Sequence, residues 1–221
     1  GGSRHPLPFV DKVIYRIIKD EATYLTALRT GQLDILEAIR WIAVDHLKET
    51  TPELQWNRWL ATSGQFIALR VDQKPFDDLR VRRALNLAVN QQEIVKHFYG
   101  GHAELMAYPQ HPEFGAYFEP LEDMPESVQQ LFSYDPEEAR RLLKEAGVPE
   151  GFAFEMQVCS CSPSHMDLVP LLESYFSKVG LKANIRPMEY ASFLSAMTTK
   201  THGPAYLLSS GHVNPMTTIR K

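Results

Sequence analysis

The chain has 221 residues, of which 44% are hydrophobic, and its formal net charge is -4 at pH 7. That length and apolar content are typical of a globular protein with one generous domain or two small ones. The small negative charge gives no electrostatic attraction to nucleic acid or to an anionic membrane. No stretch approaches the roughly 18 apolar residues of a membrane-spanning helix. We therefore expect no nucleic-acid partner.

The first third of the sequence alternates strand and helix patterns. β-Branched residues predict a strand at Lys12–Lys19, and Asp20 is a suitable cap for a helix that ends at Gly31. The other elements predicted in this part are strands at 33–36, 53–60 and 64–71 and a helix at 43–50.

The stretch KPFDDLRVRRALNLAVNQQEIV, Lys74–Val95, predicts an amphipathic helix. Asp77 or Asp78 can cap it, so that it begins near Leu79. Apolar residues recur at helical spacing and predict a buried stripe made of Val81, Ala84, Leu85 and Ala88.

Three arginines stand at the head of this helix. Arg80 and Arg83 lie three residues apart and share a face, whereas Arg82 points elsewhere, so they do not form one phosphate-binding row. We predict that they make ion pairs with Asp77, Asp78 or a neighbouring lobe.

The second half returns to regular structure after a long segment, Gly100–Ser133, which has no sustained period and predicts an ordered loop. Asp135 as the cap, Pro136 at the first position and Gly147 past the end predict a helix. Further on, the pattern predicts strands at 152–158, 181–187 and 205–210 and helices at 165–180, interrupted at Pro170, and at 189–200. Strands separated by such helices predict an α/β fold, a mixed sheet flanked by helices.

Cys159 and Cys161 are the only cysteines. In a strand both would share a face, and a disulfide across that spacing would be strained, so we predict no disulfide framework. With His165 they could offer metal ligands, but a lone Cys-x-Cys lacks the second pair of a persuasive zinc site, so no metal is expected.

Two further features of the sequence bear on function. Trp41, Trp56 and Trp59 could line a pocket, but Trp56 and Trp59 would face opposite sides of a strand, so at least one should pack in the core or against a neighbouring lobe. The sequence has no nucleophile elbow and no glycine-rich phosphate loop, which argues against an enzyme and against a nucleotide cofactor.

Four segments in order resemble one family. PFDDLRVRRALNLAVNQQEIV is similar to the signature of the family 5 extracellular solute-binding proteins, the oligopeptide, dipeptide and nickel receptors of ABC importers, at positions Pro75, Phe76, Asp78, Arg80, Arg82 and Ala84. VDKVIYRIIKDEATYLTALRTGQLDIL, YDPEEARRLLKEAGVPEGFAFEM and LLESYFSKVGLKANIRPMEYASFLSAM resemble three more of its segments. Two positions depart from the pattern, since Arg70 replaces an Asn and Asn90 replaces an Asp.

The resemblance implies a periplasmic-binding-protein-like (type II) lobe that closes on a ligand together with a second lobe. Residues 1–8 then read as an engineered scar or linker, and residues 9–221 as a single α/β lobe whose partner lobe lies elsewhere in a longer protein. The resemblance also implies that the signature helix is scaffold, that no cofactor is needed, and that the exposed cleft face favours self-association.

The resemblance places the ligand contacts at the last strand and the turn after it, AYLLSSGHVNP. The residues implied are Ser209, Ser210, Gly211, His212 and Asn214. No carboxylate stands before Pro215 to meet a peptide ammonium, so a peptide is one candidate solute among several.

The resulting prediction is a non-enzymatic receptor for a peptide or other small solute, working with a membrane permease in the periplasm or outside the cell, with the full-length protein associated with the membrane. Two alternatives stay open: a ligand-sensing module of a regulator with the same fold, and a hydrolase using Cys159 or Ser210.

Overall fold

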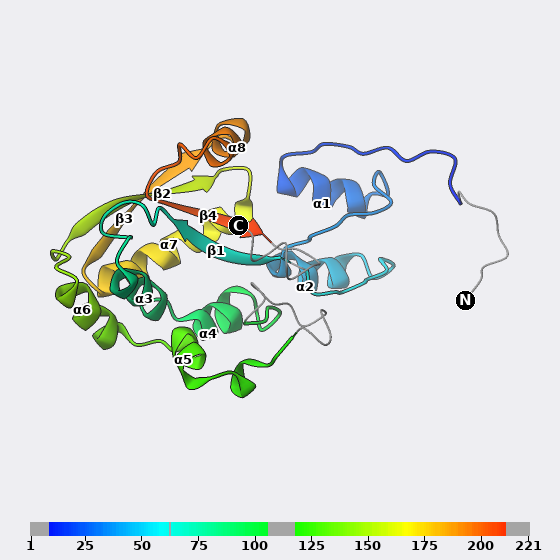
Figure 1. Cartoon of the computed structure of the whole chain (residues 1–221). Helices are drawn as coiled ribbons and strands as arrows, with labels where there is room; N and C mark the ends of the chain where they lie inside the picture. The colour runs from blue at the N-terminus through cyan, green and yellow to red at the C-terminus, as the bar shows by residue number, and fades with distance from the viewer. Residues whose placement is uncertain (1–8, 62, 106–117, 211–221) are drawn as a thin grey trace. The chain divides into compact units, whose positions relative to one another are not determined.

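The computed structural model describes residues 9–61, 63–105 and 118–210 (Figure 1). The chain divides into two units, Gly1–Trp56 and Asn57–Lys221. Among the described residues, no helix has the length and apolar character needed to cross a membrane.

The larger unit is built on a four-stranded mixed sheet with the order β1-β4-β2-β3. The chain forms β1 at Gly64–Leu69, β2 at Phe152–Cys159, β3 at Leu181–Met188 and β4 at Ala205–Ser210. Strand β2 runs parallel to both β3 and β4, whereas β1 pairs antiparallel with β4. The predicted mixed sheet with flanking helices is confirmed. Its four strands correspond to the strands predicted at 64–71, 152–158, 181–187 and 205–210.

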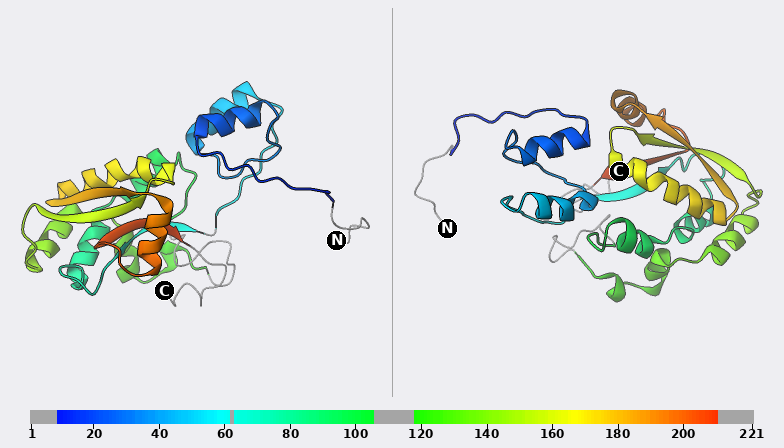
Figure 2. Two further views of the ribbon diagram at one scale, coloured as in Figure 1. Left: turned by 90° about the horizontal axis from the view of Figure 1, so that it is seen from above. Right: turned by 180° about the vertical axis from the view of Figure 1, so that it is seen from behind.

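One face of this sheet holds the core. Helices α3 (Leu79–Leu87), α6 (Pro136–Glu145) and α7 (Pro163–Lys178) bury their apolar stripes together with alternate residues of the strands. The other face meets α8 (Tyr190–Thr198), whose Phe193 ring lies 6.2 Å from the ring of Tyr206 (Figure 2). This division follows from strand geometry, because successive side chains point to opposite faces.

Short helical segments connect these elements. They are α4 at Gln91–Glu93, the π-helix η1 at Ile94–Phe98, the 3-10 helix η3 at Leu121–Asp123, α5 at Glu126–Gln129 and the 3-10 helix η4 at Gln130–Phe132. The prediction that Gly100–Ser133 lacks regular structure is therefore wrong for its second half. Each of these elements is at most five residues long, which is too short to leave a helical period in the sequence.

The predicted signature helix begins where expected, at Leu79, and Asp78 caps it by accepting a hydrogen bond from the Arg80 amide at 2.8 Å. Phe76, two residues earlier, is 2% exposed, and its ring lies 5.5 Å from that of Phe154. Ala84 is completely buried, so no larger side chain fits at that point without displacing its neighbours.

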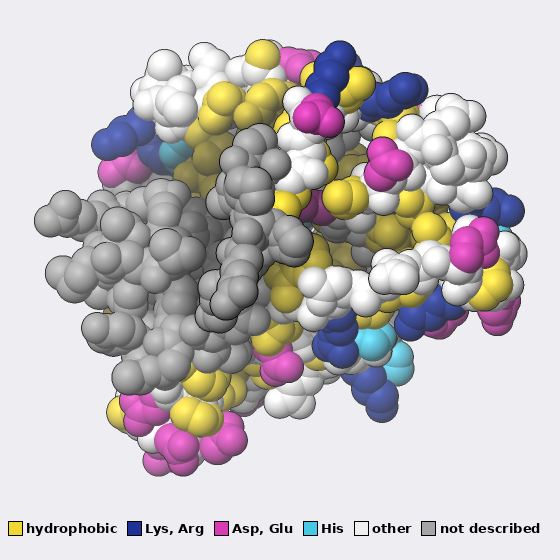
Figure 3. Space-filling view, turned by 90° about the vertical axis from the view of Figure 1, so that its right-hand side faces the viewer, with side chains coloured by type: hydrophobic (Ala, Val, Ile, Leu, Met, Phe, Trp, Pro, Cys, Tyr) yellow, Lys and Arg dark blue, Asp and Glu magenta, His cyan; other side chains and the backbone are white. Residues whose placement is uncertain are grey.

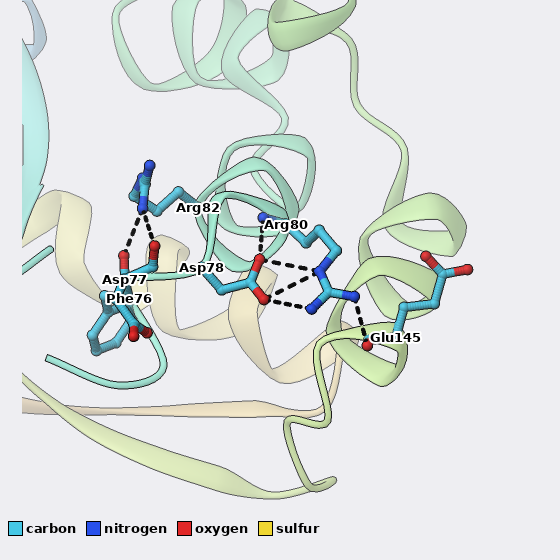
Figure 4. Close-up of polar contacts among 6 residues, drawn as sticks. All are labelled: Phe76, Asp77, Asp78, Arg80, Arg82 and Glu145. Carbon is cyan, nitrogen blue, oxygen red and sulfur yellow. Dashed lines mark hydrogen bonds and ion pairs between the residues drawn. The ribbon is translucent and has the colours of Figure 1, made fainter.

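The arginines of this helix brace the segments around it (Figure 4). Arg80 forms an ion pair with Asp78 at 2.6 Å and donates to the Glu145 carbonyl oxygen at the end of α6 at 2.8 Å. Arg82 donates to the carbonyl oxygens of Phe76 and Asp77 at 2.8 and 3.0 Å. The predicted ion pair of Arg80 with Asp78 is confirmed, whereas Arg82 binds backbone carbonyls instead of a carboxylate.

Helix α6 carries the cap that its sequence predicts. Asp135 accepts a hydrogen bond from the Glu138 amide at 2.9 Å, and its own amide donates to the Leu87 carbonyl oxygen at 3.0 Å. Gly147 follows the helix at a φ of 74°, which a residue with a Cβ adopts only with strain.

Replacing Asp135 with alanine is expected to lower the free energy of unfolding by about 1 kcal/mol, because the first turn of α6 loses an amide acceptor. Urea denaturation measures the change. Asp123→Ala, an exposed aspartate outside any cap, is the matched control. Equal losses in the two variants would contradict the capping role.

Helix α7 runs through Pro170 without a break, so the predicted interruption is wrong. Proline removes one helix hydrogen bond and normally disfavours a helix interior. Pro170 lies on the exposed side, and the opposite side of α7 buries Leu168, Val169, Leu172, Tyr175 and Phe176. That burial outweighs the lost hydrogen bond.

The smaller unit contains two helices, α1 at Glu21–Arg29 and α2 at Trp41–Thr50. Both were predicted, α2 with a later start. Asp20 caps α1 by accepting from the Thr23 amide at 2.8 Å, and Arg40 donates from Nε to Glu21 at 2.8 Å. The unit is therefore held partly by polar contacts between its two helices.

The strands predicted at Lys12–Lys19, 33–36 and 53–60 are wrong, since none of these segments forms a strand. Tyr15 and Ile17 are 90% and 93% exposed. A β pattern needs a neighbouring strand to accept and donate its ladder hydrogen bonds, and within the described residues these segments have none.

Figure 3 shows one face of the molecule. Hydrophobic side chains gather across this face, and charged side chains of both signs lie around them.

Candidate ligand-binding edge of the sheet

Two parallel strands end at one edge of the larger unit. Strand β2 ends at Cys159 and β4 at Ser210, in a register that pairs Val158 with Leu207. Helix α7 starts four residues after β2, at Pro163. Open α/β sheets bind ligands outside the carboxyl ends of their parallel strands, where helix N-termini add free amides. This edge is the candidate site.

A buried histidine reaches the end of β4 from α7. The His165 Nε2 atom lies 2.9 Å from the Ser209 hydroxyl oxygen, which joins residues 44 positions apart. His165 is 7% exposed, and its other ring nitrogen, Nδ1, is buried and has no hydrogen-bond partner among the described residues. A buried ring nitrogen without a partner is costly, so a polar group of a ligand that reached this atom through a local opening of the edge would be stabilised there.

Burial lowers the pKa of His165, because the charged imidazolium is desolvated there. The unfolded chain, with an ordinary histidine pKa of about 6.5, then binds the proton more tightly than the folded protein does. The stability contributed by the neutral ring is complete above that pH and is lost as the pH falls toward the folded-state pKa.

The free energy of unfolding is therefore expected to fall more steeply between about pH 7 and pH 5 in the unchanged protein than in His165→Gln. Urea denaturation across that range measures both slopes. A His165→Gln slope equal to that of the unchanged protein would contradict the assignment.

The turn after β2 corrects the prediction for the cysteines. Cys159 and Cys161 form a disulfide with their Cα atoms 5.1 Å apart, and the Cys161 amide donates to the Cys159 sulfur at 3.3 Å. The prediction treated both residues as part of an extended strand. Strand β2 ends at Cys159, and the turn that follows brings the two side chains together. No group of three or more metal-ligating side chains occurs among the described residues.

The structure describes only part of the predicted ligand set. Ser209 is exposed at the end of β4, beside His165, and Ser210 is the last residue of that strand. The predicted residues Gly211, His212 and Asn214 lie outside the described residues. The pairing of His165 with Ser209 was not predicted, because a contact between a helix start and a distant strand end leaves no pattern in the sequence.

The strand predicted at 53–60, which would hold Trp56 and Trp59, is absent. Trp56 and Trp59 are 38% and 59% exposed, and the Lys48 Nζ atom lies 5.7 Å from the ring centre of Trp56. Neither ring is part of the core of its own unit. Packing against a neighbouring lobe stays a prediction.

A shallow hollow of about 530 Å³ lies at the opposite end of β2. It is lined by Lys74, Pro75, Asp77, Asp78, Ala146, Gly147, Val148, Pro149 and Phe152. Phe152 begins β2 and Cys159 ends it, so the hollow and the candidate edge are separated by the length of the strand.

Residues 5–217 match the model of the bacterial extracellular solute-binding proteins, family 5 Middle. The chain belongs to this family. Among the family 5 proteins that it resembles, Di/tripeptide-binding protein 1 of Pseudomonas aeruginosa is 31% identical over 206 residues, 91% of this chain and 37% of that protein. Glutathione-binding protein GsiB of Salmonella choleraesuis is 30% identical over 183 residues, 83% of this chain and 34% of that protein.

The fold is also that of solved periplasmic binding proteins. The periplasmic binding protein DppA of Helicobacter pylori, in complex with the peptide STSA, superimposes with a TM-score of 0.77 at 23% identity, covering 98% of this chain and 40% of that one. The chain therefore spans between about a third and two fifths of the length of these relatives.

The two departures from the family 5 pattern have local structural partners. Arg70 forms an ion pair with Asp72 at 2.6 Å, which lowers the pKa of that carboxyl group to about 2, and it donates to the carbonyl oxygens of Lys200 and His202. Asn90 caps α4 by accepting from the Glu93 amide at 3.0 Å. Both changes are compatible with the fold.

Proposed function

We propose that this chain is one lobe of the solute-binding receptor of an ABC importer and that it captures a small, peptide-like solute at the β2–β4 edge. The observation that carries the proposal is the buried Nδ1 atom of His165, which has no hydrogen-bond partner among the described residues and lies beside Ser209, where two strand ends and the start of α7 meet. Family membership and the names of the relatives support the receptor class.

The mechanism proposed is hinge closure. A solute bound at this edge makes further contacts with a second lobe, and the closed form is favoured by contacts made in both lobes at once. The closed receptor, in the periplasm or outside the cell, then delivers its solute to a permease in the membrane. In this role the chain carries out no reaction of its own.

The chemistry of the edge suits a solute with both donors and acceptors. A neutral imidazole offers one donor and one acceptor, and the serine hydroxyl can do either. The partner of the His165 ring is the uncharged Ser209 hydroxyl, so this pair favours peptide amide or carboxylate groups over an ammonium group.

Calorimetric titration of the full-length parent protein with dipeptide, tripeptide, glutathione and nickel–histidine solutions tests the proposal, with this chain titrated in parallel. We expect one solute class to bind the parent and to bind this chain at least about 100-fold more weakly, because a single lobe supplies half of the contacts. Equal affinity for this chain alone would show that the site is complete within it and would overturn the two-lobe proposal.

Ser209→Ala in the parent protein is expected to weaken solute binding by about tenfold, since the hydroxyl is lost from the edge and His165 loses its partner. Ser195→Ala, an exposed serine of α8, is the matched control and should bind as the unchanged protein does. Unchanged affinity in Ser209→Ala would move the site away from the β2–β4 edge.

A further inference from the structure

The disulfide between Cys159 and Cys161 lies in the turn between β2 and α7 and has one buried and one exposed end. Cys159 is 4% exposed at the end of β2, whereas Cys161 is an exposed residue. A thiol in solution can therefore approach the Cys161 sulfur without any opening of the core. Thiol–disulfide exchange depends on such access.

Other bonds hold this turn independently of the disulfide. The Ser160 amide and hydroxyl both donate to the Met188 carbonyl oxygen, at 2.9 and 3.0 Å, and the Ser162 amide donates to the Cys159 carbonyl oxygen at 3.2 Å. The disulfide also closes a ring of only three residues, which removes little freedom from the unfolded chain. The turn therefore keeps hydrogen bonds of its own when the disulfide is broken.

We propose that Cys159–Cys161 is an exchange site for small thiols in the folded protein. A thiolate attacks the Cys161 sulfur, a mixed disulfide forms there, and the bond to Cys159 breaks with its electron pair on the Cys159 sulfur, which then takes a proton. A second thiol attacks the mixed disulfide, releases the first thiol as its disulfide and leaves Cys161 reduced. Two thiols thus supply the two electrons.

Two structural features stabilise the two thiolates that depart in these steps. The Cys161 amide already donates to the Cys159 sulfur at 3.3 Å, so the departing thiolate keeps a hydrogen bond. In the second step Cys161 is the departing thiolate, and it directly precedes Ser162, the cap of a 16-residue helix whose N-terminus stabilises a neighbouring thiolate. The extracellular family is consistent with a disulfide that forms and persists, because such compartments are oxidising.

The first test uses the whole chain purified without reductant. Iodoacetamide labelling in denaturant, followed by intact-mass measurement, should give no label in the unreduced protein and two labels in protein first treated with dithiothreitol in native buffer. The far-ultraviolet circular dichroism spectrum of the reduced protein in native buffer should be unchanged. Labelling without reductant would show that the disulfide does not form. A requirement for denaturant before reduction would show that it is structural. Either result overturns the proposal.

The second test separates the two sulfurs. In Cys159→Ser the remaining thiol is exposed, and in Cys161→Ser it is buried, so the first variant should react with Ellman's reagent at least about tenfold faster than the second. Equal rates, or a faster Cys161→Ser variant, would contradict attack at Cys161. A full reaction of both variants in denaturant confirms that each thiol is intact.

Discussion

Replacing Phe76 with alanine is expected to lower the free energy of unfolding of the larger unit by about 3–5 kcal/mol. The Phe76 side chain is 2% exposed, and its ring makes edge contacts with Phe152 and Phe154 at centroid distances of 6.5 and 5.5 Å. The substitution removes these contacts and leaves a cavity beneath the segment that caps α3. Urea denaturation followed by circular dichroism measures the loss.

The matched control is Phe9→Ala, the same substitution at a residue that is 67% exposed. It should change the free energy of unfolding by less than about 0.5 kcal/mol. A loss below about 1 kcal/mol in Phe76→Ala would mean that the family 5 signature does not anchor the core through this ring.

Hydrogen exchange is expected to differ strongly between two segments that both carry a strand pattern. Amide hydrogens of β2 take part in ladders with β3 and β4, whereas residues 12–19 have no ladder partner among the described residues. Exchange in β2 should be slower by a factor on the order of 1,000 or more, since it requires opening of the core.

Deuterium uptake measured by mass spectrometry, with peptides from 154–158 as the internal reference, tests this expectation. Rapid uptake across 12–19 at every protein concentration agrees with the structure. Protection of 12–19 that grows with protein concentration would show that this segment pairs with a second copy. Protection that does not depend on concentration would contradict the exposed conformation.

The best sequence predictions rest on local chemistry. Asp135, Pro136 and Gly147 fixed the bounds of α6 because a cap, a first-turn proline and a glycine at positive φ each act on their own neighbours. The signature helix was located for the same reason, by Asp78. Such signals do not depend on what the rest of the chain does.

The failed predictions depend on distant partners. A β-branched run such as Lys12–Lys19 forms a strand only beside another strand, and the sequence of the run does not say whether one is present. The prediction that Pro170 interrupts a helix was wrong for the opposite reason. Packing of α7 on the sheet stabilises the helix despite a residue that locally disfavours it. Tertiary context decided both.

For the candidate site, the sequence predicted only which segment of the chain contributes to it. The family resemblance pointed to the end of β4, and Ser209 lies there. The sequence offered His165, Cys159 and Cys161 as possible metal ligands. In the structure His165 forms a hydrogen bond with Ser209, and the two cysteines form a disulfide with each other. Sequence spacing suggested that the three were near one another, but their orientations depend on the turn after β2.

The antiparallel pairing of β1 with β4 places Gly64 opposite Ser210, so two points 146 residues apart in the chain become neighbours. A module whose incoming and outgoing strands are adjacent can be inserted into a loop of a host protein without stretching that host. Grafting residues 64–210 between two neighbouring loop positions of an unrelated carrier should therefore leave the carrier folded. The same adjacency makes the segment a natural starting point for circular permutation.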